Sequence, residues 1–128
     1  MPPRDPLQRV RDILDATRAI RAFVEGMDEA SFRSDRRTLD AVLRNLTVIG
    51  EAARNVPEEF RARFPEVPWL EMSDMRNVVV HEYFGVDVGI LWQTATKDVA
   101  VLEAALGAVV TALGGEPGSR DESGRGGR

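Results

Sequence analysis

The sequence has no cysteine, and it has only one histidine, His81. Without cysteine the chain forms neither a disulfide framework nor a thiolate metal site. A single histidine among scattered carboxylates also lacks the ligand spacing of a zinc or calcium site. We therefore expect no bound metal and no cofactor.

Long apolar runs are missing as well. The first ten residues, MPPRDPLQRV, lack the apolar core of a signal peptide. The most apolar late segment, from Val99 to Leu113, contains Glu103 and is too short to span a bilayer. These features predict a cytoplasmic protein with no membrane partner.

Positive charge is in the minority, with 17 basic and 21 acidic residues and a formal net charge of −4. This balance argues against a protein that coats nucleic acid through bulk electrostatics. All but one of the cations are arginine, the exception being Lys97. Arginine suits phosphate recognition, although a genome rich in arginine codons gives the same bias. Any polyanion site must be local, made by a few arginines that the fold gathers together.

What the sequence does contain is apolar residues spaced three and four apart, the period of an α-helix. A first helix is predicted from Asp5–Pro6 to Gly26, with Phe23 and Val24 on its inward face, and the run 28–33 can add a short helical turn. A second helix is predicted from Ser34 or Asp35 to Pro57, followed by a short helix over 57–64. Gly50 interrupts the second helix, which is tolerated more readily where another backbone comes close.

Two more helices are predicted, over 68–83 and from Asp87 to Gly114, and Gly85 suits a left-handed C-cap between them. No segment alternates as a strand does. The predicted fold is therefore all-α, an up-down bundle of about four main helices. Residues 1–113 form the predicted domain. Residues 114–128 are rich in glycine and lack large apolar side chains, so we expect them to be disordered.

The segment from Met75 to Asp87, MRNVVVHEYFGVD, is the best candidate for chemistry because histidine titrates near neutral pH. On an ideal helix Asn77 and His81 share a face, whereas Arg76 lies about 140° from His81. Three arrangements could still bring Arg76 and His81 into one site: a distorted helix, the long reach of arginine, or two copies of the segment meeting in a dimer. We favour the dimer, with arginine reach contributing.

Each of these residues also has a purely structural explanation. His81 can be a helix-end residue bonded to a neighbour, and Tyr83 can be a packing residue. Arg76 can form a structural ion pair with Asp74, Glu71 or Glu51. Glu51 is either a solvated carboxylate or a residue that holds Arg76 in place. Periodicity and spacing alone indicate only a helical domain of unknown role.

The same segment resembles the Arg-x4-6-His signature of HEPN-fold ribonucleases, and its extended form resembles the R-x4-H-x-Y motif of HepT toxins. Three further pieces agree in order and spacing: IGEAARNVPEEFRARFP, VPWLEM and LWQTATKDV. The resemblance runs from about Leu7 to Leu113. One departure is the polar pair Ser73–Asp74, which adds a carboxylate close to Arg76.

The resemblance implies a metal-independent endoribonuclease that cuts RNA by attack of the 2′-hydroxyl. In this mechanism His81 transfers protons, Arg76 steadies the phosphorane, and Asn77 orients the imidazole or binds a phosphate oxygen. One histidine per chain cannot conveniently act as both base and acid. A homodimer with a composite site at its two-fold seam would supply two histidines.

The resemblance also implies a toxin of the HepT/MNT toxin–antitoxin type. Its partner would be a minimal nucleotidyltransferase antitoxin that transfers AMP to Tyr83. The alternative function is a non-catalytic helical module that binds a nucleotidyltransferase partner or a nucleotide. A domain with only a structural role is a third possibility.

Overall fold

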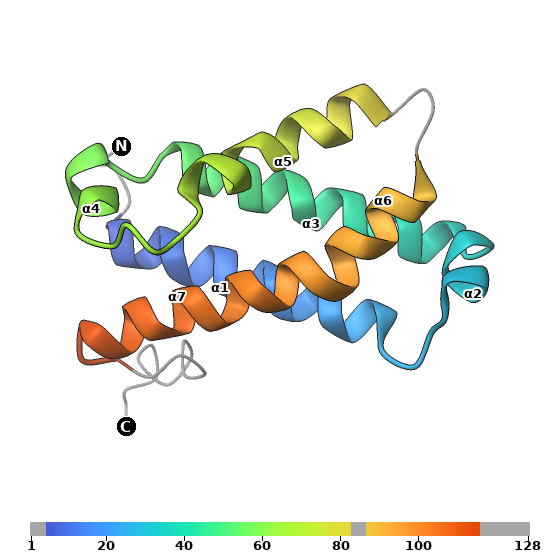
Figure 1. Ribbon diagram of the computed structural model, residues 1–128, viewed down its shortest axis with the longest axis horizontal. Coiled ribbons are helices and arrows are strands. Elements are labelled where there is room, and N and C mark those ends of the chain that lie inside the picture. The colour runs from blue at the N-terminus through green and yellow to red at the C-terminus, as the bar shows by residue number, and fades with distance from the viewer. Residues whose placement is uncertain (1–4, 83–86, 116–128) are drawn as a thin grey trace.

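The computed structural model describes residues 5–82 and 87–115, with side chains described over 5–76 and 87–115 (Figure 1). Every regular element in these ranges is a helix, so the predicted all-α class is confirmed. The elements are α1 (Pro6–Val24), α2 (Glu29–Arg33), α3 (Arg36–Arg54), α4 (Glu58–Ala62), α5 (Trp69–Glu82), α6 (Val88–Gln93), the π-helical turn η1 (Thr94–Asp98) and α7 (Val99–Ala112).

Four long helical segments form the bundle, as predicted: α1, α3, α5 and the run from α6 through η1 to α7. α3 packs extensively against both α1 and α5, and α7 packs against α1. In Figure 1 the start of α1 and the end of α7 lie at one end of the bundle, while α5 ends at the opposite end. No helix within the described ranges is both long and apolar enough to cross a bilayer.

The boundaries of α1 follow from its sequence. The Asp5 side chain accepts a hydrogen bond from the backbone N–H of Leu7 (2.9 Å) and caps the first turn. Gly26 follows the helix with a positive φ of 79°, a conformation that glycine adopts without strain. The expectation that Phe23 points inward is wrong, because its side chain is 45% exposed. Val24 takes the buried position at the end of the helix, so its neighbour turns to solvent.

Two aspartates start the short helix α2 and the long helix α3. The backbone N–H of Ser31 donates to Asp28, and that of Thr38 donates to Asp35. These backbone hydrogen bonds, with the side chains of the same two partners, hold the pKa of each carboxyl below its usual range. The sequence prediction that α3 begins at Ser34 or Asp35 is therefore confirmed, with Asp35 as the cap.

The last long helix departs from the expected regular geometry at η1, where five residues from Thr94 to Asp98 form a π-helical turn. Ala95 and Val99 stay buried on either side of the wider turn. The apolar residues keep a spacing of three and four through this turn, so periodicity gives no sign of it. Asp87 caps the start of α6, as predicted, through the backbone N–H of Ile90 (3.1 Å).

At its C-terminus the bundle ends at two glycines, as predicted. Gly114 has a φ of +86°, and the backbone N–H of Gly115 donates to the carbonyl of Val110 (2.9 Å). The predicted domain boundary at residue 113 stays a prediction. The tail over 116–128 and the proposed Gly85 cap lie outside the described residues.

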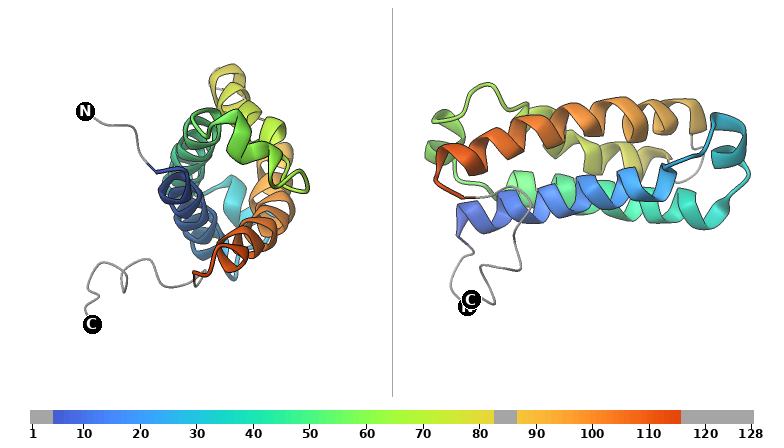
Figure 2. Two further views of the ribbon diagram at one scale, coloured as in Figure 1. Left: turned by 90° about the vertical axis from the view of Figure 1, so that its left-hand side faces the viewer. Right: turned by 90° about the horizontal axis from the view of Figure 1, so that it is seen from below.

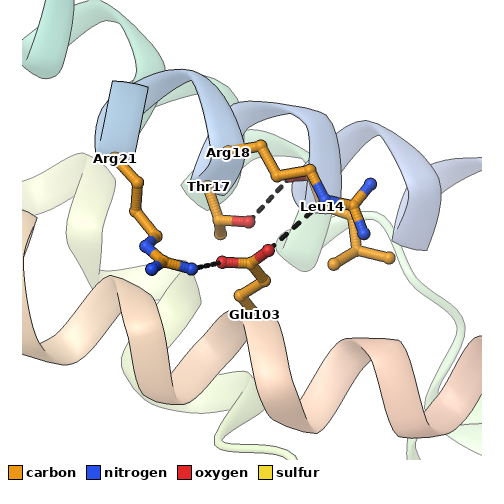
Figure 3. A network of polar contacts seen from close by, with 5 residues as sticks. All are labelled: Leu14, Thr17, Arg18, Arg21 and Glu103. Carbon is orange, nitrogen blue, oxygen red and sulfur yellow. Dashed lines mark hydrogen bonds and ion pairs between the residues drawn. The ribbon is translucent and has the colours of Figure 1, made fainter. Parts of the chain in front are cut away.

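An ion-pair network joins α1 to α7 (Figure 3). The Glu103 carboxylate on α7 accepts from Arg21 and from the Nε of Arg18, the latter at 3.4 Å. The nearby Thr17 hydroxyl is buried and donates to the carbonyl of Leu14 (2.7 Å). The arginines are partly exposed, so the pairs orient the two helices more than they stabilise them.

Candidate active site

The site begins where α3 and α5 cross. Gly50, in the last third of α3, lies against the backbone of α5 at Arg76. A Cβ added to Gly50 would stand 2.7 Å from the Arg76 Cβ and 2.8 Å from its backbone nitrogen. Glycine is therefore required here for close approach, which is the reason the sequence suggested for a glycine inside this helix. The contact fixes the position of Arg76 relative to α3.

Glu51, the next residue on α3, forms an ion pair with the Nε of Arg76. The Arg76 side chain is 39% exposed and that of Glu51 is 49% exposed, so solvent reaches both groups. Of the three carboxylates that the sequence offered to Arg76, the structure pairs Glu51 with it. Such an exposed pair contributes little to stability. The pair instead holds the guanidinium in one place. Because arginine carries five N–H groups, its other N–H groups remain available to donate hydrogen bonds.

The helical backbone of α5 continues past Arg76 to Glu82. Because the helix is regular here, five residues turn position 81 by about 140° from position 76. A distortion of the helix therefore does not bring the two positions together. The side chains of Asn77 and His81 lie outside the described side chains, and Tyr83 lies outside the described residues. Their predicted roles therefore stay predictions, as does the role of Glu51 in a reaction.

Sequence reasoning missed Arg44. It stands seven residues before Glu51 on the unbroken helix α3, so the two share a face. Its side chain is exposed. No carboxylate within the described residues lies within ion-pair distance of it. The seven-residue spacing could have shown that Arg44 and Glu51 share a face of the helix. This spacing points to Arg44 only once Glu51 is known to contact Arg76.

An open cleft of about 740 Å³ lies beside Glu51, between α1 and α3. Its lining includes Asn45 of α3 and Asn55, which directly follows α3, together with Arg9 and Asp12 of α1. The cleft gives solvent and small polar groups access to the Glu51 side of the ion pair. Among the side chains described over 5–76 and 87–115, no three carboxylate or imidazole groups are placed to hold a metal ion.

Comparison with known proteins gives this arrangement a family. The family model described as "Ribonuclease HepT-like" matches residues 13–109. A protein of Thermococcus cleftensis named "Probable ribonuclease HepT" is 42% identical over 94 residues, which cover 73% of this chain and 86% of that protein.

Two further relatives carry the name "Putative RNase". One, from Methanocaldococcus jannaschii, is 38% identical over 99 residues, or 77% of this chain and 91% of the relative. The other, from Caldanaerobacter subterraneus, is 37% identical over 100 residues, or 78% and 89%. No solved structure matches the chain. The matched region contains the α3–α5 crossing with Gly50, Glu51 and Arg76, and the chain belongs to the HepT-like ribonuclease family.

Proposed function

We propose that this protein is a metal-independent endoribonuclease, the toxin of a HepT/MNT-type toxin–antitoxin pair, with Arg76, Asn77 and His81 in its active site. The observation that carries the proposal is the Arg76 guanidinium, which is solvent-accessible and forms an ion pair with Glu51 of α3. Arg76 lies on α5, the helix that also carries the single histidine. The names of the relatives support ribonuclease activity.

In the proposed reaction the RNA 2′-hydroxyl attacks the adjacent phosphorus and expels the 5′-oxygen of the next nucleotide. His81 takes the hydroxyl proton, and a second imidazole gives a proton to the departing oxygen. Arg76 donates to the phosphoryl oxygens, where negative charge develops. Asn77 orients the imidazole or binds a phosphate oxygen. The products are a 2′,3′-cyclic phosphate and a free 5′-hydroxyl.

Glu51 has a positioning role in this proposal. Its carboxylate occupies the Nε edge of Arg76 and leaves the terminal N–H groups for phosphate. Arg44, exposed on the same face of α3 and without a carboxylate partner among the described residues, is placed to bind the RNA backbone beyond the scissile phosphate. Because these two arginines concentrate positive charge at one site, a protein with a net negative charge can still bind RNA there.

The second imidazole comes from a second copy of the chain. Each protomer has one histidine, and its regular α5 helix places positions 76 and 81 on different sides. Two copies related by a two-fold axis would bring Arg76 of one protomer near His81 of the other. A strictly monomeric protein with full activity would exclude this arrangement.

The purified chain is expected to cut single-stranded RNA in the presence of EDTA, because none of the proposed steps uses a metal. The measurement is gel analysis of end-labelled RNA, with the cyclic phosphate end identified by mass spectrometry. The matched substrate is the same RNA with 2′-O-methyl groups, which removes the nucleophile and is expected to stay intact. If EDTA abolishes cleavage, or if the methylated RNA is cut equally fast, the mechanism is wrong. Absence of any cleavage would favour the non-catalytic binding module.

The antitoxin in this proposal is a minimal nucleotidyltransferase that transfers AMP to the Tyr83 hydroxyl. Tyr83 directly follows the last residue of α5, the helix that carries Arg76. An AMP group there adds a negative phosphate and a bulky base within reach of the same helix. It would compete with RNA phosphate for Arg76 and obstruct the site.

Tyr83→Phe is expected to remain as toxic as the wild type but to escape neutralisation by the co-expressed antitoxin. Phenylalanine keeps the ring and removes only the acceptor oxygen. Growth after induction and intact mass of the purified toxin measure the two effects, and the wild-type chain should gain the mass of AMP. A Tyr83→Phe protein that still gains AMP and loses toxicity would show that another residue is the acceptor.

A further inference from the structure

A second open groove, of about 430 Å³, lies between α5 and the stretch from η1 into α7. Its apolar lining comes from three helices and from the turn before α5, while its polar lining is a hydroxyl and three carboxylates. The lining residues are Leu46, Pro68, Glu71, Asp74, Met75, Thr94, Asp98, Val101 and Leu102.

The groove exists because the bundle is open on this side. α5 packs on α3 and α7 packs on α1, but within the described ranges α5 and α7 do not pack extensively on each other. The end-on view of Figure 2 shows these helices around the centre of the bundle. Buried Leu46 and Leu102 form the floor, and Val101 remains 64% exposed at its edge. An unpaired side between two helices of a bundle is a place where another helix can pack.

Negative charge surrounds this apolar floor. Glu71 and Asp74 line it from α5, and Asp98 lines it from η1. All three are exposed, and no basic group of the described residues lies within ion-pair distance of any of them. Three uncompensated carboxylates repel RNA phosphates and attract lysine or arginine. An ionised carboxylate only accepts hydrogen bonds, whereas lysine and arginine side chains only donate them, so the two kinds of group are complementary.

We propose that this groove binds an amphipathic, positively charged helix of a protein partner. Along α5 and the residue just before it, the lining runs from Pro68 to Met75, about 10 Å at 1.5 Å per residue. The groove therefore accommodates about two turns of helix. Apolar residues one turn apart would contact Leu46, Met75 and Val101, and flanking basic residues would pair with the carboxylates.

This surface is separate from the proposed active site. Arg76 contacts Gly50 and Glu51 of α3, whereas Glu71 and Asp74 face the groove toward η1 and α7. Helix binding in the groove does not require that the chain cut RNA. Loss of ribonuclease activity and loss of helix binding are therefore separate results.

The test uses a capped, alanine-based helical peptide that carries two leucines four positions apart, flanked by arginines. Titration of the labelled chain, followed by the methyl NMR signals of Met75, Val101 and Leu102, should show saturable shifts at these positions. Glu71→Gln combined with Asp98→Asn should weaken binding about tenfold at low salt, since each neutralised charge removes one ion pair. Val101→Asp should weaken it at least as much, because it places a charge against the apolar contact.

Ile90→Asp, at an aliphatic position that is 52% exposed and lies outside the groove, is the control and should leave the affinity unchanged. A peptide of the same composition with its leucines on opposite faces should bind at least tenfold more weakly. The proposal is overturned if the designed peptide causes no shifts in the groove, or if the groove variants bind it as well as the wild type does. It is also overturned if single-stranded RNA shifts the groove signals and the peptide does not.

Discussion

Replacing His81 with alanine is expected to lower the rate of RNA cleavage by about 10²- to 10⁴-fold, the usual contribution of a positioned acid or base. His81 is the only histidine in the chain, so no neighbouring imidazole can substitute for it. Single-turnover cleavage of a labelled RNA measures the effect. Induction of the variant alone in a bacterium should no longer arrest growth.

Two comparisons make the His81 result specific. Thermal unfolding should show that His81→Ala folds like the wild type. Arg33→Ala, which removes an exposed arginine paired with Glu29 within the short helix α2, should cut RNA at the wild-type rate. A His81→Ala protein that cuts as fast as the wild type would exclude the proposed chemistry, and growth arrest by that variant would point to a toxicity unrelated to cleavage.

Gly50→Ala is expected to destabilise the fold by about 1–3 kcal/mol through overpacking. The better helix propensity of alanine, about 1 kcal/mol, offsets part of this loss. Overpacking should prevail because the added Cβ meets the backbone nitrogen and Cβ of Arg76, which cannot rotate away. The midpoint of thermal unfolding should therefore fall by several degrees, and RNA cleavage should fall as the displaced Arg76 leaves Glu51.

Gly89→Ala in α6 is the matched control, since its added Cβ meets only the side-chain oxygens of Asp87 and Glu29, at 3.3 and 3.6 Å. Glu51→Gln distinguishes the effect of Arg76 position from the effect of fold stability. The substitution adds no volume but removes the charge that holds Arg76. It should lower kcat while the unfolding midpoint stays near the wild-type value. An unfolding midpoint for Gly50→Ala equal to or above that of the wild type would show that α3 and α5 separate easily.

Much of the fold could be predicted because its signals are local. Asp5, Asp35 and Asp87 cap helices through backbone groups two or three residues away, and Gly26 and Gly114 adopt the positive φ that glycine favours. Apolar spacing then located the long helices. The pairing of Arg76 with Glu51 was one of several alternatives, because a sequence does not show which carboxylate crosses to which helix.

The features that were not predicted depend on contacts between distant segments. Nothing in the local pattern distinguishes Phe23 from a buried residue, and the π-turn at Thr94–Asp98 keeps the ordinary apolar spacing. Arg44 becomes a candidate only after α3 and α5 are docked. The acidic groove exists only because α5 and α7 do not pack extensively on each other. Interhelical geometry of this kind is set by side-chain packing, which helix propensity does not encode.

The placement of the first and last helices has a practical consequence for experiments with fusion proteins. Helix α1 starts and α7 finishes at the same end of the bundle, remote from the end at which α5 finishes (Figure 1). An affinity handle or fluorophore joined directly to residue 5 or residue 115 therefore starts from the end of the bundle opposite the end of α5. Immobilised or labelled protein should therefore keep the C-terminal end of α5 open to substrates and to a modifying enzyme.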